Sequence, residues 1–200
     1  SKDDLMRLKI LDFKRKKSQN SNTACAVQTS IASNHPYYNL SSYMPINGES
    51  RVYAELRNAV PILDSAINKI VRLCEGFKFN TGNEKVNDMM NSYFESINVG
   101  GNQKGIASFI SNYLNQLLTF GTAIGEIVMC DDGIYALYNS ELSSIELKRA
   151  PNGVDIDFYN YGNKISKPNL ILYSVLNPKP AELCGTSLLS GLPFVSDILL

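Results

Sequence analysis

The sequence predicts an α+β fold, with a helical first half, then a small and mostly antiparallel sheet, and finally a helix that leaves the domain. Apolar residues recur at helical spacing up to residue 120, whereas they alternate with polar residues between residues 124 and 176. Clusters of Gly, Asn, Asp and Pro separate the alternating segments, as is typical of turns between strands. The 200 residues, 44% of them hydrophobic, suffice for one core of this kind.

The first 48 residues differ in composition from the predicted globular domain, residues 49–200. Residues 1–17 place apolar residues at helical spacing and carry seven basic and three acidic residues, which predicts a short amphipathic helix of net charge +4. Residues 18–48 contain no Lys, Arg, Asp or Glu and are rich in Ser, Asn, Thr and Tyr. We therefore expect an extended arm without a core of its own, whose tyrosines are available to pack on another subunit.

Three helical segments are expected at the start of the domain. An apolar stripe runs from residue 52 to residue 74, and Pro61 either kinks this helix or begins a second one at its first turn. The next segments are 84–97 and 105–120, and the second of these has an apolar face broad enough to be mostly buried. Gly121 is suited to end that helix in a left-handed residue before a strand.

Strands are predicted after Gly121, where the periodicity changes from helical to alternating. Segments 124–130 and 134–138 flank Asp131-Asp132-Gly133, a sequence typical of a β-hairpin. Further strands are expected over 142–149, 154–159 and 170–176. Thr186 or Ser187 is placed to cap a final helix that contains Pro193. The chain starts at Ser1 and stops inside an apolar run, so we expect it to be part of a longer protein.

Few residues suggest catalysis, and we predict no catalytic residue, cofactor or metal. The single histidine, His35, lies in the uncharged arm, so neither a catalytic triad nor a multi-histidine metal site is supported. The four cysteines form no CxxC pair and are expected to be reduced thiols of an intracellular protein. If missing sequence completed an enzyme site, Glu126 with Asp131 and Asp132 would be its best candidate. Alone, Glu126 fits either a polar strand face or a pair with a basic residue.

The overall charge argues against a generic nucleic-acid binder. Nineteen basic residues balance nineteen acidic ones, whereas such a binder normally has a basic excess. The apolar runs are too short to span a bilayer, so no membrane partner is expected. One cluster has a distinct sign and is a candidate contact for nucleic acid or an acidic partner: Lys14, Arg15, Lys16 and Lys17. A solvated helix end explains that cluster equally well.

Several short sequence segments, which we call phrases, resemble in their order and spacing the portal proteins of tailed bacteriophages, which are ring-shaped head–tail connectors. They are RNAVP at 57–61 before a long helix, LLTFGTA at 117–123 where a helix turns directly into a hairpin, the strands from 124 to 176, and GTSLL at 185–189 before the last helix. The resemblance covers residues 50–200 and the first half of a portal chain. It implies the wing region, with the stem and clip regions absent.

The resemblance implies a non-enzymatic structural subunit of a ring of about twelve copies at one capsid vertex. Such a ring forms the passage for double-stranded DNA during packaging and ejection, without sequence specificity. It docks terminase, capsid and tail-adaptor proteins, so the chain would be assembled in the host cytoplasm and reside in the virion.

The arm, residues 1–48, matches no part of the portal family. We hypothesise that it orders on contact with a neighbouring subunit or the capsid. The alternative function is another phage or mobile-element adaptor that binds a partner through its basic N-terminal segment.

Overall fold

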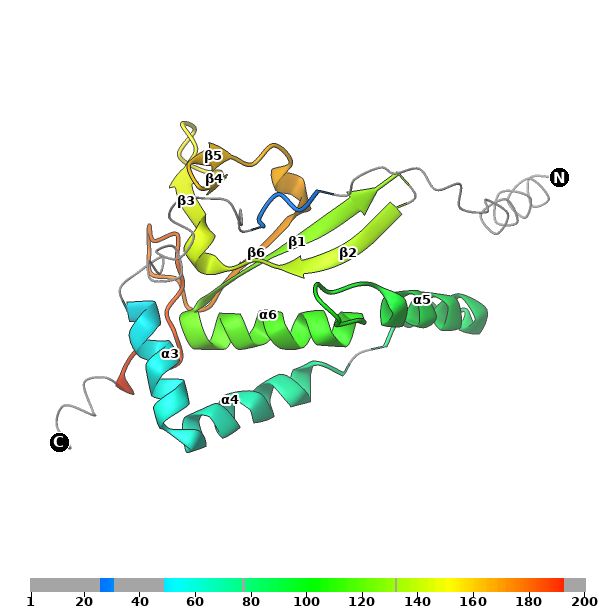
Figure 1. Cartoon of the computed structure of the whole chain (residues 1–200), viewed down its shortest axis with the longest axis horizontal. Helices are drawn as coiled ribbons and strands as arrows, with labels where there is room; N and C mark the ends of the chain where they lie inside the picture. The colour runs from blue at the N-terminus through cyan, green and yellow to red at the C-terminus, as the bar shows by residue number, and fades with distance from the viewer. Residues whose placement is uncertain (1–25, 31–48, 77, 132, 193–200) are drawn as a thin grey trace.

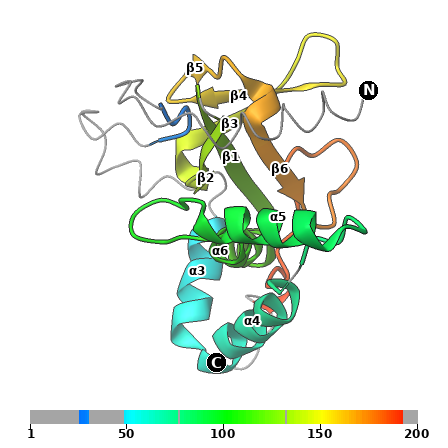
Figure 2. The same ribbon diagram turned by 90° about the vertical axis from the view of Figure 1, so that its right-hand side faces the viewer.

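The computed structural model describes residues 26–30, 49–76, 78–131 and 133–192, and it confirms the α+β fold class. Within these residues, four α-helices precede the strands: α3 (Glu49–Ala59), α4 (Pro61–Cys74), α5 (Glu84–Ser96) and α6 (Ile106–Phe120). Helix α6 lies directly beneath the strands, and α3 and α4 lie on its other side (Figure 1). The view turned by 90° shows the same arrangement (Figure 2). Helix α6 therefore separates the strands from the first two helices.

Pro61 begins a second helix, one of the two outcomes that the sequence allowed. Helix α3 ends at Ala59, Val60 is extended (φ −118°, ψ 92°), and Pro61 is the first residue of α4. Proline suits this position because the first N–H of a helix has no intrahelical acceptor. The break changes which side chains reach the core. Three residues of the expected apolar stripe are exposed: Val52, Ile70 and Cys74.

Helices α5 and α6 begin and end within one residue of their predicted bounds. The side chain of Asn83 caps α5 by accepting hydrogen bonds from the N–H groups of Lys85 and Val86. Helix α6 ends at Gly121, whose left-handed backbone (φ 76°) turns the chain directly into a strand, as predicted. All residues of α6 except Ala107 are buried or partly buried, which confirms the expectation from its broad apolar face.

The strands form two antiparallel sheets of three strands each, where the sequence predicted one small sheet. The first sheet has the order β2–β1–β6, with β1 (Thr122–Cys130), β2 (Gly133–Asn139) and β6 (Ile171–Val175). The second has the order β3–β4–β5, with β3 (Ile145–Arg149), β4 (Ile156–Asn160) and β5 (Asn163–Lys164). The prediction of one sheet is wrong because β6 returns to pair with β1, from Thr122↔Val175 to Glu126↔Ile171, whereas β3, β4 and β5 pair among themselves. The second sheet is thus inserted between β2 and β6.

Two predicted strands are shorter than expected at their starts. The segment 142–149 opens with a 3₁₀ turn, η1 (Leu142–Ser144), before β3. Val154 lies in the turn before β4 and is 82% exposed. In both places a turn precedes the extended residues, and apolar alternation by itself does not show where a turn ends.

Buried apolar side chains form three clusters, and each has a residue of α6 in it or packed against it. One lies between the sheets around Ile124 and Phe158, with Phe120 against it. A second gathers residues of α3 and α4 with Leu189, and Leu118 packs on it. A third combines Phe109 with the hairpin and Ile97. Helix α6 is therefore the element that all parts of the core share.

The last part of the chain is only partly described. The Ser187 hydroxyl accepts a hydrogen bond from the Leu189 N–H at 2.9 Å, but residues 188–191 form turns and no helix, so neither Thr186 nor Ser187 starts a helix at this point. The turns end at Gly191 and Leu192 is helical, whereas Pro193 and the rest of the predicted final helix lie outside the described residues. So do the predicted helix over 1–17 and most of the arm. No described helix has the length and apolar character needed to cross a membrane.

Candidate functional site

Most residues that the sequence singled out lie outside the described part of the chain: Lys14, Arg15, Lys16, Lys17, His35 and Asp132. Glu126 is buried in the middle of β1, whereas Asp131 is exposed in the hairpin turn. Five residues of extended strand span about 17 Å, so these two carboxylates do not converge on one site. Among the described residues, no group of three His, Cys, Asp or Glu side chains is placed to hold a metal ion.

The Glu126 carboxylate holds a segment from the N-terminal side of the chain. Its Oε1 accepts hydrogen bonds from the backbone N–H of Gln28 (2.9 Å) and from the side-chain amide of Gln28 (3.3 Å). Its Oε2 accepts from the backbone N–H of Thr29 (2.9 Å) and from the Thr29 hydroxyl (2.8 Å). Glu126 is only 1% exposed, and none of the ion pairs between described residues includes it. Neutral donors therefore replace the water that this buried carboxylate would otherwise need.

We call residues 26–30 the strap, and the groups that hold it the socket: Glu126, Ser140, Asn160, Ser166 and Lys167. The Ser140 hydroxyl donates to the Thr29 hydroxyl at 2.6 Å. The Asn160 side-chain amide donates to the carbonyls of Gln28 (2.8 Å) and Ser30 (3.1 Å). Because Glu126 belongs to the first sheet and Asn160 to the second, the strap joins the two sheets; it is the blue segment of Figure 1.

Two further socket residues, Ser166 and Lys167, form hydrogen bonds with the Gln28 side chain. Its Oε1 accepts hydrogen bonds from the Lys167 N–H (3.0 Å) and from the Ser166 hydroxyl (3.1 Å). Its amide nitrogen donates to Glu126 and, at 3.4 Å, to the Lys167 carbonyl. Thr29 is fully buried, whereas Ser30 is exposed. Recognition of the strap is thus almost wholly by hydrogen bonds to its backbone and to two side chains.

Strand alternation explains why Glu126 faces the strap. Ile124 lies two residues before Glu126 and so shares its face, which packs toward the second sheet. The opposite face meets α6, where a Cβ added to Gly125 would lie 2.8 Å from the Phe109 ring. Neither sequence interpretation of Glu126 is correct, because the residue is neither on a solvated face nor paired with a base. The only feature of the sequence that pointed to Glu126 is that it is a single charged residue in an otherwise apolar strand.

A second group of hydrogen bonds lies where α6 meets β1, at a place that we call the junction. The chain returns after β6 and crosses this junction, so the phrases at 117–123 and 185–189 are in contact. The Leu176 N–H donates to the Gly121 carbonyl (2.8 Å), and the Thr186 N–H donates to the Leu176 carbonyl (2.7 Å). A Cβ on Gly121 would lie 2.6 Å from the Gly185 carbonyl, and one on Gly185 would overlap the Gly121 carbonyl oxygen. Both glycines are needed for this close backbone approach.

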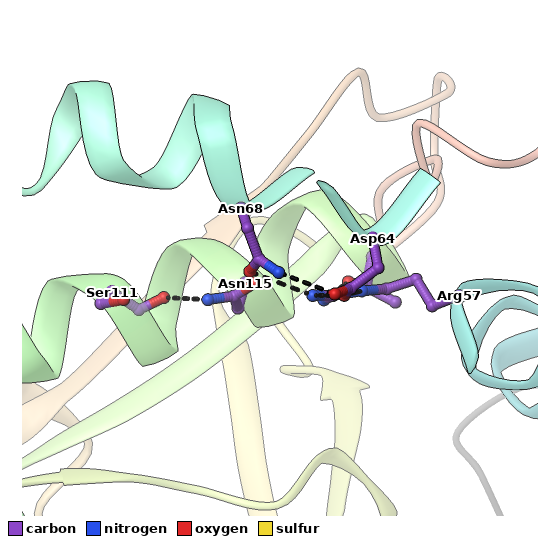
Figure 3. Close-up of polar contacts among 6 residues, drawn as sticks. Arg57, Asp64, Asn68, Ser111 and Asn115 are labelled. Atoms are coloured by element: carbon purple, nitrogen blue, oxygen red, sulfur yellow. Dashed lines mark hydrogen bonds and ion pairs between the residues drawn. The ribbon is translucent and has the colours of Figure 1, made fainter. Parts of the chain in front are cut away.

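Arg57 connects the third phrase, at 57–61, to the same junction. Its Nε donates to Asp64 Oδ1 at 2.9 Å, and its Nη1 donates to the Thr119 hydroxyl at 2.8 Å. Asn68 also donates to Asp64, at 2.8 Å, so α3, α4 and α6 share one polar network (Figure 3). The Thr119 carbonyl in turn accepts from the Ser187 hydroxyl at 2.6 Å. Three phrases that are far apart in the sequence are therefore linked through Thr119.

A groove of about 860 Å³ lies beside this junction, lined by Tyr53, Phe120 and residues between 179 and 190. Burial raises the pKa of the Cys184 thiol in this groove above its usual value. Cys184 and Cys74 are free thiols, and Cys74 is exposed. Cys130 is disulfide-bonded, so the expectation of reduced thiols is wrong for that residue.

Tyr173 is expected to make the domain sensitive to alkali. Burial raises its pKa to about 12, and its hydroxyl donates to the Leu183 carbonyl. A raised folded-state pKa gives stability that is present below pH 10 and lost as the pH rises through 12, because the unfolded chain loses this proton first. Urea unfolding of Tyr173→Phe between pH 8 and pH 12 should therefore show a flatter decline above pH 10 than the unchanged protein. Equal slopes would contradict the assignment.

Comparison with known proteins shows likeness at the level of the fold. No family model matches the sequence, and no curated protein matches it. A chain in a solved structure of the neck of an empty gene transfer agent (GTA) particle has a TM-score of 0.54 and 14% identity, over 73% of this chain and 43% of that one. A chain in the virion of a native GTA particle has a TM-score of 0.52 and 14% identity, over 76% of this chain and 41% of that one. The chain thus spans less than half the length of either.

Proposed function

We propose that this chain is the wing region of a portal-type subunit in a phage-derived particle, a structural protein of the head–tail region and not an enzyme. The fold likeness to chains of a GTA neck and a GTA virion, over about three quarters of this chain, carries the proposal. A second observation supports it. The portal-like phrases at 57–61, 117–123 and 185–189 meet in one hydrogen-bonded junction, which gives their order and spacing a common physical cause.

The proposed mechanism is geometric. Repeated head-to-tail contacts close into a ring of about twelve copies when the rotation between neighbours closes. Double-stranded DNA passes through the ring, and terminase, capsid and tail-adaptor proteins dock on it. The balance of nineteen basic and nineteen acidic residues suits a passage through which DNA slides, because strong phosphate contacts would hold the DNA. In this proposal the protein resides in the virion, at the portal vertex.

The native mass of the complete gene product tests this function. We expect one homogeneous species of about a dozen subunits in moderate salt, because a closed ring has a defined stoichiometry. Mass photometry or native mass spectrometry gives this number directly. A product that stays monomeric or dimeric in the presence of its scaffold and capsid proteins would overturn the proposal and favour an adaptor.

The outer face of α4 is the surface we expect at the contact between ring subunits. At 100° per residue, Ile62, Ile70 and Leu73 fall within an arc of about 80°, whose centre lies about 120° from that of the buried Ile67 and Val71. Ile62 is 74% exposed and Leu73 is 77% exposed. Large apolar side chains gathered on one exposed face are typical of protein–protein contacts.

Leu73→Glu is expected to abolish ring formation while leaving the fold intact. A charge at a buried subunit contact is costly, whereas a surface change on the free domain shifts the free energy of unfolding by about 0.5 kcal/mol or less. The measurements are the native mass of the complete product and a urea unfolding curve. Val154→Glu is the matched control, since Val154 is 82% exposed but lies in a turn away from α4. Normal rings from Leu73→Glu would exclude this face as the contact.

A further inference from the structure

The socket is a built binding site whose ligand is a short, uncharged piece of chain. It offers a buried carboxylate to the consecutive backbone N–H groups of Gln28 and Thr29, and the Ser140 hydroxyl donates to the hydroxyl of Thr29. The hydrogen bonds at Glu126 join residues 97 and 98 positions apart in the sequence. Without the strap, Glu126 would lose all four of these donors. The site is therefore incomplete unless some copy of the strap fills it.

The segment that connects the strap to α3 is long enough for the strap to reach a socket other than that of its own chain. Eighteen residues, 31–48, connect the strap to α3, and they contain no Lys, Arg, Asp or Glu. Fully extended, eighteen residues span at most about 60 Å, roughly four times the radius of gyration of a 150-residue domain, which is about 15 Å. The socket of an adjacent copy in a ring is within that reach. The contacts of the strap are the same whichever copy supplies it.

We propose that the strap is exchanged between copies, so that in the assembled particle the strap of one subunit fills the socket of the next. Each subunit would then contribute Gln28 and Thr29 to a neighbour's site and receive the same residues from the other side. Exchange of an identical segment links subunits without any new recognition chemistry. The ring in which this happens rests on the proposed function, whereas recognition of the strap by the socket does not.

A disulfide trap tests the exchange in the complete protein. The Thr29 and Ser140 hydroxyl oxygens are 2.6 Å apart, close enough for cysteines at these positions to form an S–S bond of about 2.0 Å. Thr29→Cys and Ser140→Cys are placed in separate chains with different tags, and the four native cysteines are replaced by Ser in both, so that the disulfide at Cys130 and the free thiols form no link of their own. The two chains are assembled together, oxidised and run on a non-reducing gel. Ala26→Cys paired with Ser140→Cys is the control, because Ala26 is exposed at the start of the strap.

Exchange predicts a covalent pair that carries both tags, at least tenfold more abundant than in the control. The double variant, with both cysteines in one chain, should give a ladder of linked subunits. Rings that assemble normally but give no pair with both tags, together with only within-chain bonds in the double variant, would overturn the exchange and leave the proposed function intact. If no ring forms, the proposed function fails. The same two experiments at about millimolar protein still decide the exchange: pairs with both tags from the separate chains support it, and only within-chain bonds in the double variant overturn it.

Discussion

Gly121→Ala is expected to lower the free energy of unfolding by about 3 kcal/mol or more, a large part of the total for a domain of this size. Two costs add at this position. The left-handed backbone (φ 76°) strains any residue with a Cβ by about 1 kcal/mol. The new methyl group would also lie 2.6 Å from the backbone of Gly185 and Thr186, and backbone atoms move only together with the segments that they join.

Gly185→Ala separates the second cost from the first. Gly185 does not have a positive φ, but a Cβ there would overlap the Gly121 carbonyl oxygen and lie 2.5 Å from the Leu176 N–H nitrogen. We expect a loss of about 2–4 kcal/mol from this crowding alone, together with the loss of hydrogen bonds between the crossing segments.

Two other glycines serve as matched controls. Gly82 has the same φ of 76° as Gly121 with no atom within 4 Å of its added Cβ, so Gly82→Ala should lose only about 1 kcal/mol. Gly76 has neither a positive φ nor a close neighbour, so Gly76→Ala should change stability by about 0.5 kcal/mol or less. Urea unfolding curves of the four variants measure all of these values. Equal losses for Gly121→Ala and Gly82→Ala would show that the junction is not tightly packed.

Glu126→Gln is expected to detach the strap and to lower the free energy of unfolding by about 2–4 kcal/mol. Glutamine has nearly the same size but only one acceptor oxygen, and its amide group would point N–H donors at the N–H groups of Gln28 or Thr29. The charge that strengthens all four hydrogen bonds is also lost. The loss is bounded by the free energy of docking the strap, because a released strap is hydrated by water.

Hydrogen exchange at the strap amides measures the detachment directly. The N–H groups of Gln28 and Thr29 should be protected in the unchanged protein and exchange freely in Glu126→Gln. Glu146→Gln is the control, since Glu146 is half-exposed and its ion pair with Lys148 lies at the surface. Thr29→Val removes the hydroxyl and keeps both backbone donors, so it should cost about 1–2 kcal/mol. Persistent protection of Thr29 in Glu126→Gln would show that the carboxylate does not hold the strap.

The candidate site was only partly accessible from the sequence. Glu126 is a lone charge in an apolar strand and so stands out in the sequence, but Gln28 and Thr29 carry no signal that pairs them with it. They lie in an uncharged stretch with no periodicity, about a hundred residues away. The phrases around Arg57, Gly121 and Gly185 are separate local patterns in the sequence. Their contact through Thr119 depends on the path of the chain after β6, which no local pattern specifies.

The sequence by itself determined the fold class, the bounds of α5 and α6, the presence of a kink or a break at Pro61, and the hairpin after Gly121. These features follow from neighbours within a few residues, where periodicity, proline, glycine and asparagine act through local backbone geometry. Only the tertiary structure decided that the strands divide into two sheets, that part of α4 stays exposed and that the strap fills the socket. The reason is that buried strands, carbonyls and carboxylates need partners, and distant segments supply those partners according to how the whole chain packs.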